Sequence, residues 1–253
     1  MISSIDNIKI KEIVKLRKAN KRRKSELIVI EGQKEIEMAM RRGIEIHELF
    51  YCSVFGKEGM RGVENTEVSK KVFRKISFRE NPDGYLALAK PIETAFSDIK
   101  IKKGLILVLH SLEKPGNMGA ILRTADAAQV DAVVLSDTKI DIFNPNVIRA
   151  SLGAVFAVPI VIASREGVLS WLREKDLKIY IADDQGVRNY YEVDFNKSVA
   201  IVIGAEHEGV SEFWKKAADE TVKIPMNGLV DSLNASVSAG IIIYDVVRQK
   251  NLK

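Results

Sequence analysis

From residue 104 onward, short and almost continuously apolar runs alternate with longer segments of helical periodicity, and this alternation constrains the fold most strongly. A strand that is apolar along its whole length has both faces buried, which is typical of parallel sheets with helices on each side. The alternation therefore predicts an α/β fold around a parallel sheet. The predicted strands are residues 105–109, 132–135, 157–162, 179–182, 199–203 and 221–224, and the predicted helices are residues 118–129, 145–152, 167–175, 211–218 and 234–249.

The N-terminal part contains shorter elements and more charged residues. A polar, charged and irregular segment around residues 91–103 marks a domain boundary. The sequence thus predicts a small α/β domain at residues 1–95, a linker at 96–103 and the larger domain at 104–253. In the small domain we expect helices at residues 5–18, 33–42 and 67–75, strands at 27–30, 48–53 and 84–89, and a basic turn at 19–24.

Composition excludes several classes of protein. Cys52 is the single cysteine, so no internal disulfide forms, and with 3 His a zinc site built from Cys and His is disfavoured. The N-terminus has no signal-peptide pattern, and no apolar run approaches the roughly 20 residues that a membrane helix needs. We expect a soluble cytoplasmic protein without a metal or a membrane segment.

Positive charge is concentrated near the N-terminus. Residues 1–100 carry 21 basic and 15 acidic side chains, whereas residues 101–253 carry 18 and 19. Residues 9–24 alone hold nine basic side chains against one acidic one. This density is typical either of a solvated helix face or of a surface for a polyphosphate partner, and the asymmetry favours nucleic acid. The candidate RNA contacts are Lys18, Lys21, Arg22, Arg23 and Lys24.

The loop after the first long strand leads into a helix with two candidate site residues. Ligands of open parallel sheets bind beyond the carboxyl ends of the strands, which directs attention to such loops. Asn117 suits either N-capping or catalysis. Arg123, on an otherwise small and apolar helix, is either a surface charge or is directed at an anion. Gly116 and Gly119 lack the G-x-G-x-x-G spacing of a Rossmann cofactor site, which excludes a dehydrogenase.

The loop after the strand at 199–203 begins with Gly204, where the backbone is open to close approach by a ligand. Glu206 follows as a hydrogen-bond acceptor. The three ionisable residues at 206–208 are adjacent in sequence, and this spacing disfavours convergence on a metal ion.

The loop after the strand at 221–224 is unusually apolar for a surface connection. Its composition predicts that it packs against a cofactor or the rest of the chain. Ser232 and Asn234 place short hydrogen-bonding groups at the start of the last helix, where they suit either ordinary capping or a site.

Three segments together resemble the ordered motifs of the SpoU (TrmH-like) RNA ribose 2′-O-methyltransferases of the SPOUT class. They are NMGAILRTA at 117–125, IGAEHEG at 203–209 and IPMNGLVDSLNAS at 224–236, and RASLGA at 149–154 resembles the segment between the first two. The basic residues at 22–24, shortly before residues 28–32, resemble the ribosomal-protein-like RNA-binding domain at the front of many members.

The resemblance implies a deep trefoil knot in the C-terminal domain, S-adenosylmethionine as methyl donor, no metal, and a homodimer through the last helix. Gly204, Ile224 and Leu233 would contact S-adenosylmethionine through their backbone, and Met226 would line the adenine pocket. The catalytic group implied by the resemblance comprises Arg123, Asn117, Glu206, Ser232 and Asn234.

Arg123 matches the catalytic arginine that is often assigned as a general base. A guanidinium stays protonated, so we expect Arg123 instead to hold the 2′-oxygen and the adjacent phosphate and to stabilise developing charge. Asn117 and Asn234 would orient the ribose and the arginine, Glu206 would fix the arginine or the cofactor loop, and Ser232 would bond at the same site.

The domain layout favours large-subunit ribosomal RNA over tRNA as the substrate, because the resemblance pairs a full front domain with the catalytic domain. Two alternatives remain open on the sequence alone. One is a tRNA ribose 2′-O-methyltransferase, and the other is a non-catalytic RNA-binding factor in ribosome assembly.

Overall fold

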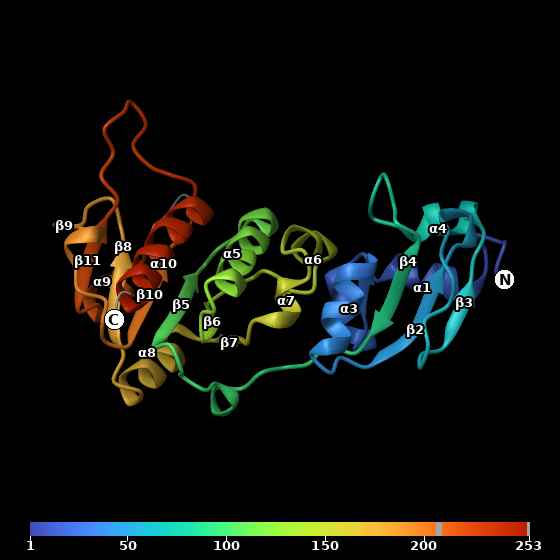
Figure 1. The fold of residues 1–253 in the computed structure, drawn as a ribbon, viewed down its shortest axis with the longest axis horizontal. Helices are drawn as coiled ribbons and strands as arrows, with labels where there is room; N and C mark the ends of the chain where they lie inside the picture. The colour runs from blue at the N-terminus through green and yellow to red at the C-terminus, as the bar shows by residue number, and fades with distance from the viewer. Residues whose placement is uncertain (206–208, 252–253) are drawn as a thin grey trace. The chain divides into compact units, whose positions relative to one another are not determined.

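The computed structural model describes residues 1–205 and 209–251 and contains two compact units (Figure 1). Unit 1 comprises Met1–Ile92 and Asp141–Ala157, and unit 2 comprises Glu93–Ile140 and Val158–Lys253. Residues 141–157, which the predicted boundaries assign to the C-terminal domain, therefore pack within unit 1. No helix in the described part of the chain is long and apolar enough to cross a membrane.

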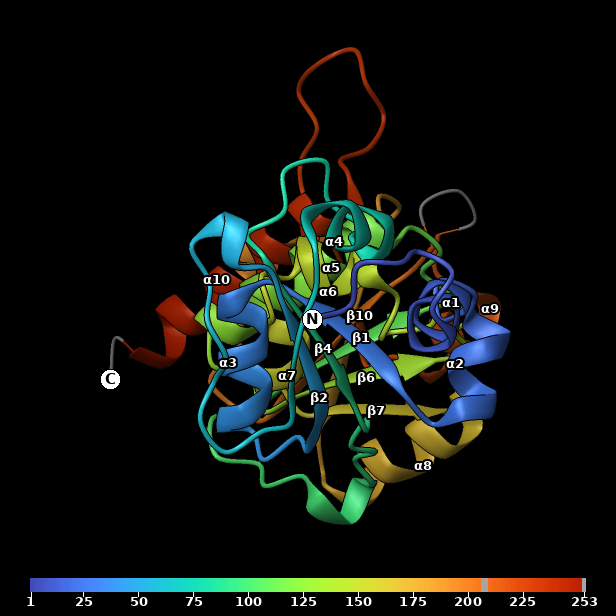
Figure 2. The same ribbon diagram turned by 90° about the vertical axis from the view of Figure 1, so that its right-hand side faces the viewer.

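Unit 1 is built on a four-stranded sheet with the order β1-β4-β2-β3. β4 is antiparallel to β1 and β2, whereas β2 and β3 are parallel. Alternate side chains point to opposite faces, so α1 and α4 cover one face while α3 covers the other (Figure 2). The elements are α1 (Ile8–Lys15), α2 (Ala19–Ser25), β1 (Ile28–Glu31), α3 (Gln33–Arg41), β2 (Ile46–Tyr51), β3 (Asn65–Glu67), α4 (Lys70–Ile76), β4 (Tyr85–Ala89), α6 (Pro145–Ala150) and α7 (Ala154–Ala157).

Unit 2 is built on a seven-stranded sheet with the order β7-β6-β5-β10-β8-β11-β9, and every adjacent pair is parallel. The predicted α/β class with a parallel sheet is thus confirmed. α8 and α9 pack on one face of the sheet, while α5 and α10 pack together on the other. The elements are β5 (Leu105–His110), α5 (Pro115–Ala127), β6 (Ala132–Ser136), β7 (Ile160–Ala163), α8 (Arg165–Glu174), β8 (Lys178–Ala182), β9 (Arg188–Asn189), β10 (Val199–Ile203), α9 (Glu212–Ala217), β11 (Glu220–Lys223) and α10 (Ala235–Asn251).

The basic segment at residues 19–24 is helix α2 and not the predicted turn. Lysine and arginine are good helix formers, but the segment has no apolar periodicity from which a helix is predicted. Its anchor is polar: the buried Arg22 side chain donates hydrogen bonds to the carbonyl oxygens of Leu16 and Arg17 at the end of α1, at 2.5 and 2.9 Å. This helix therefore depends on a buried guanidinium and not on an apolar stripe.

Candidate active site

β5 and β10 lie side by side at the centre of the unit 2 sheet, and the strand order reverses between them. The chain continues from β5 to β6 and β7 on one side, whereas β8, β11 and β9 lie beyond β10 on the other. Loops leaving the carboxyl ends of two such strands diverge and leave a crevice, where ligands of open α/β sheets bind. The loop into α5 and the loop that begins at Gly204 flank this position.

A hydrogen bond joins the first and last motifs of the sequence. The Asn234 Nδ2 group donates to Asn117 Oδ1 at 3.1 Å, connecting α5 with the start of α10. Asn234 Oδ1 accepts from the Ser236 backbone N–H at 2.9 Å and from its hydroxyl at 2.6 Å, so the same side chain also caps α10. Asn117 is not a capping residue, because α5 begins at Pro115 with Lys114 at the N-cap. Two residues 117 positions apart thus share one small polar cluster.

Arg123 lies further along α5, about 9 Å from Asn117 along the helix axis. Its side chain is exposed, and within residues 1–205 and 209–251 its guanidinium has no hydrogen-bond or ion-pair partner. α5 packs closely on α10, where a side chain added at Gly240 would touch Thr124 at 3.9 Å. A small, apolar helix therefore presents one uncompensated cation, which suits an anionic or partly anionic ligand.

Gly204 is buried at the carboxyl end of β10. Ala205 and Gly209 exchange two backbone hydrogen bonds of 3.0 Å each, which hold Gly209 beside the end of β10. A Cβ atom at position 204 would overlap the Gly209 carbonyl and lie 2.6 Å from the Val210 nitrogen. The loop geometry therefore requires glycine. Glu206 lies outside the described residues, and its role stays a prediction.

The segment at 224–234 differs from the sequence prediction. Ile224 and Met226 are half-buried after β11, but Leu229 is fully exposed and Val230 is 65% exposed. Figure 1 shows this segment projecting from unit 2 ahead of α10. Leu229 and Val230 therefore do not pack against the rest of the chain, and the predicted alternative, packing against a cofactor, stays a prediction. Ser232 and Leu233 are exposed on the same segment.

The five basic residues predicted to contact RNA divide into two kinds. Lys18, Lys21, Arg23 and Lys24 are exposed on or beside α2. Arg22 has a side chain only 4% exposed, and its guanidinium binds the Asp141 carboxylate through Nε at 2.9 Å and Nη2 at 2.5 Å. The prediction of an RNA contact does not fit Arg22, because all of its donors face the interior of unit 1.

One pair missed by the sequence analysis lies beneath the crevice. His110 is the last residue of β5, and Ser136 is the last residue of the neighbouring β6. Both are buried, with His110 Nδ1 3.2 Å from Ser136 Oγ. A histidine at the end of an otherwise apolar strand is the sequence feature from which a buried polar pair could have been predicted. In the described part of the chain, no group of three or more His, Cys, Asp or Glu side chains is placed to hold a metal ion.

Comparison with known proteins agrees with this geometry. A model of the SpoU rRNA methylase family matches residues 104–244, and a model of the MRM3-like substrate-binding domain matches residues 7–87. The first match spans more than half of the chain. The protein therefore belongs to the SpoU rRNA methylase family, and the resemblance drawn from the three motifs is confirmed.

Individual relatives are similar over nearly the whole chain. The 23S rRNA (guanosine(2553)-2′-O)-methyltransferase RlmP of Bacillus subtilis is 28% identical over 245 residues, covering 96% of this chain and 97% of its own. A crystal structure of an RNA 2′-O ribose methyltransferase is 37% identical with a TM-score of 0.87, and covers 99% of each chain. The AdoMet-bound rRNA methyltransferase of Sinorhizobium meliloti is 30% identical with a TM-score of 0.89, and covers 98% of this chain and 97% of its own.

Proposed function

We propose that this protein transfers a methyl group from S-adenosylmethionine to a ribose 2′-hydroxyl of large-subunit ribosomal RNA. The observation that carries the proposal is the Asn234–Asn117 hydrogen bond, which joins the first and third motifs beside the point where the strand order reverses. Relatives with AdoMet-bound structures and 23S rRNA specificity support the donor and the substrate.

The residues of unit 2 fit an adenosyl ligand. In the described chain, the backbone N–H and C=O groups of residues 224–233 form no hydrogen bonds with other backbone groups, so those of Ile224 and Leu233 are open to a ligand. Half-buried Ile224 and Met226 supply apolar contact at the same edge of the sheet. Gly204 holds the neighbouring loop close to the backbone of β10. S-adenosylmethionine supplies an activated methyl group on a sulfonium.

The chain then has to position the ribose and stabilise charge. The bound donor would supply its methyl group to the 2′-oxygen, and the hydroxyl proton would pass to water. Arg123 holds the 2′-oxygen and an adjacent phosphate with its planar fork and stabilises the partial negative charge on oxygen. Asn117 and Asn234 orient the ribose through their shared cluster, and Ser232 and Glu206 complete the group.

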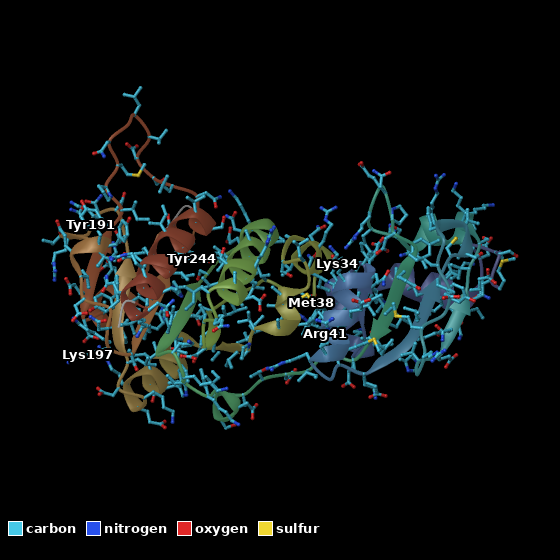
Figure 3. All side chains as sticks on the ribbon, in the orientation of Figure 1. Lys34, Met38, Arg41, Tyr191, Lys197 and Tyr244 are labelled. Atoms are coloured by element: carbon cyan, nitrogen blue, oxygen red, sulfur yellow. The ribbon has the colours of Figure 1, made fainter. Side chains whose placement is uncertain are left out.

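The proposal assigns residues 1–95 to RNA binding, 96–103 to the linker and 104–253 to catalysis. Exposed Lys18, Lys21, Arg23 and Lys24 supply positive charge for the phosphate backbone. We also propose that the catalytic domain contains a trefoil knot. The protein forms a homodimer through α10 and acts in the cytoplasm. Val237 is 48% exposed on α10, and Tyr244, labelled in Figure 3, is 50% exposed on the same helix, so the two give the proposed dimer an apolar surface.

Tritium transfer from labelled S-adenosylmethionine to total RNA from a strain lacking the gene tests this function. We expect label in the large-subunit ribosomal RNA. Label in tRNA would retain the methyltransferase and overturn the substrate. Absence of label from every RNA, with S-adenosylmethionine binding also absent by calorimetry, would overturn the activity and favour the non-catalytic assembly factor.

Gly204→Ala is expected to weaken S-adenosylmethionine binding at least about tenfold, or about 1.4 kcal/mol. The added methyl group overlaps the Gly209 carbonyl, so the loop that begins at residue 204 has to move. Calorimetric titration measures the Kd. Gly167→Ala in α8 is the matched control, because its methyl group meets only Ser164 Oγ at 3.4 Å. Equal Kd values for Gly204→Ala and Gly167→Ala would contradict a cofactor role for this loop.

A further inference from the structure

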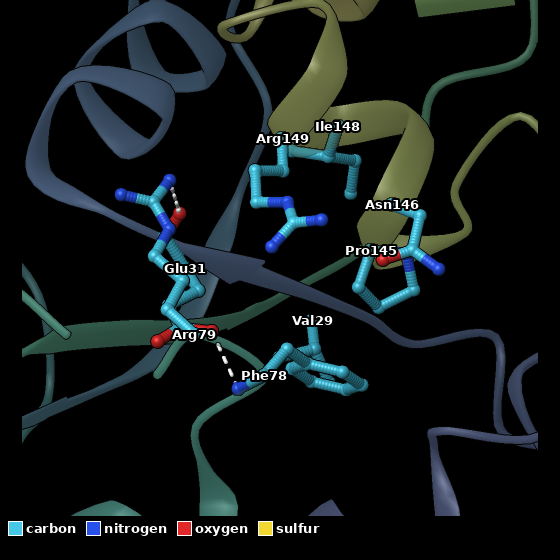
Figure 4. A pocket seen from close by; sticks show the side chains of 8 residues that line it. All are labelled: Val29, Glu31, Phe78, Arg79, Pro145, Asn146, Ile148 and Arg149. Carbon is cyan, nitrogen blue, oxygen red and sulfur yellow. Dashed lines mark hydrogen bonds between the residues drawn. The ribbon is translucent and has the colours of Figure 1, made fainter. Parts of the chain in front are cut away.

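Unit 1 contains a cavity of about 520 Å³ that the proposed function does not use. It is lined by Glu35 of α3, by residues 78–81 between α4 and β4, and by Arg149 and Leu152 of the α6–α7 segment. A narrower cavity beside it shares Phe78, Arg79 and Arg149 (Figure 4). The volume of the larger cavity, about 520 Å³, lies in the range of small-molecule and single-nucleotide sites.

Two of the four charged side chains in the wall of this cavity, Glu35 and Arg79, compensate each other. Arg79 Nη2 donates to the Glu35 carboxylate at 2.5 Å and to the Glu31 carbonyl at 2.9 Å. The Glu31 carboxylate accepts the Ser77 hydroxyl and, at 2.7 Å, the Phe78 N–H. These bonds fix the shape of the wall and leave the Glu31 and Glu35 carboxylates satisfied.

Arg149 and Glu80 are not compensated in this way. Arg149 is the cation of the two. Its guanidinium points into the narrower cavity (Figure 4), and within the described residues it has no hydrogen-bond or ion-pair partner. Glu80 lies exposed in the wall, as does the Asn81 amide. The cavity wall therefore offers one free bidentate cation, one exposed carboxylate and one amide, of which the cation and the amide suit a phosphate and the polar edge of a base.

Leu152 follows the C-terminus of α6, where its N–H donates to the Arg149 carbonyl at 3.1 Å and the Gly153 N–H donates to the Ile148 carbonyl at 3.2 Å. It adopts φ +52°, the left-handed conformation of such a helix cap, which costs a leucine roughly 1 kcal/mol or more and which asparagine adopts readily. Its side chain is 49% exposed in the cavity wall. Together with half-buried Phe78, it forms an apolar surface in that wall.

Two arginines, one just before α2 and one within it, contact the segments that carry the cavity wall. The Arg17 guanidinium lies 5.0 Å from the centre of the Phe78 ring and donates to the carbonyl oxygens of Lys75 and Ser77 at 2.9 and 2.8 Å. On the other side, Arg22 binds Asp141 at the start of the segment that carries Arg149. Arg22 thus ties the segment that carries Arg149 to α2, and Arg17, just before α2, contacts Phe78.

We infer that this cavity binds one unstacked nucleotide of the RNA substrate, with its phosphate on Arg149 and its base or sugar against Phe78 and Leu152. The inference rests on the proposed function, because it takes RNA as the ligand. Single-stranded nucleotides are recognised by stacking on apolar or planar side chains with a cation on the backbone, whereas a duplex does not enter a cavity of this size. The nucleotide is a second anchor beside the charged surface of α2.

Full-length variants and protein-free large-subunit ribosomal RNA test the inference. Arg149→Gln is expected to raise the RNA Kd and KM about tenfold, as for loss of a charge-assisted hydrogen bond. The slope of log Kd against the logarithm of the salt concentration is expected to fall by about one. The matched control is Arg41→Gln, an exposed arginine at the end of α3 that does not line the cavity (Figure 3). Its KM is expected to stay within twofold of wild type.

Leu152→Asn separates ligand binding from folding. Asparagine tolerates the left-handed conformation, so the melting temperature is expected to stay equal or rise, while the RNA Kd rises about threefold or more through lost apolar contact. Wild-type RNA affinity in both Arg149→Gln and Leu152→Asn would overturn the inference and assign the cavity to a partner other than RNA. Wild-type protein that neither binds nor methylates any RNA would overturn the proposed function itself.

Discussion

Arg123→Met is expected to lower the kcat of RNA methylation by about 10²- to 10³-fold, the loss seen when one donor to a developing oxyanion is removed. The Kd for S-adenosylmethionine is expected to stay unchanged, since the arginine is proposed to hold the ribose and phosphate and not the donor. Single-turnover transfer of labelled methyl groups at saturating RNA measures the effect on the chemical step.

Arg123→Lys distinguishes a planar fork from a simple positive charge. Loss of one of two charge-assisted hydrogen bonds predicts a decrease in kcat of about 10- to 100-fold. Neither variant is expected to change the unfolding midpoint, because the Arg123 side chain is exposed and has no partner in the described chain. Asp126→Asn, three residues further on the same helix, serves as the control with unchanged kcat. Near wild-type turnover by Arg123→Lys would refute bidentate positioning.

Arg22→Met is expected to destabilise unit 1 by about 3 kcal/mol, the lower end of the range for breaking a buried ion pair. The Asp141 carboxylate, 17% exposed, would keep part of its hydration but lose two hydrogen bonds from Arg22. The carbonyl oxygens of Leu16 and Arg17 would also lose their donor. Asp141→Asn is expected to destabilise the unit in the same direction.

Hydrogen exchange of the β1 amides measures this effect, because both tryptophans, Trp171 and Trp214, lie in unit 2 and do not report on unit 1. Exchange is expected to become about 100-fold faster in Arg22→Met, and to recover partly in Arg22→Met/Asp141→Leu, where no buried charge is left unpaired. Arg23→Met, on the exposed side of the same helix, is the control. Equal protection in Arg22→Met and Arg23→Met would contradict a structural role for the ion pair.

The sheet of unit 2 follows from the sequence because its strands are buried on both faces. The apolar runs at 105–109 and 199–203 correspond to β5 and β10, which pair with each other in the predicted parallel sheet. β9, by contrast, has only two residues, Arg188 and Asn189, and no apolar run to mark it. The predicted strand at 157–162 begins later, at Ile160, because Ala157 ends helix α7 and Pro159 has no N–H for a ladder.

Long-range polar contacts limit the prediction of the site. In the sequence, an asparagine at position 117 or 234 is equally compatible with helix capping. Only the fold shows that the two side chains form a hydrogen bond with each other. In the same way, the charge run indicates a basic surface but does not show that Arg22 turns inward to Asp141, 119 positions away. Residues 141–157 belong to unit 1 through such contacts, which leave no periodic pattern in the sequence.

The most direct test of the proposed function is the alkaline cleavage pattern of large-subunit ribosomal RNA. Alkaline cleavage needs a free 2′-hydroxyl, so a methylated ribose leaves one resistant phosphodiester bond. RNA from a strain with the wild-type gene is predicted to show one resistant position that is cleaved normally in the deletion strain and in the Arg123→Met strain. Identical cleavage patterns in all three strains would contradict the assignment of this protein as a ribose 2′-O-methyltransferase of that RNA.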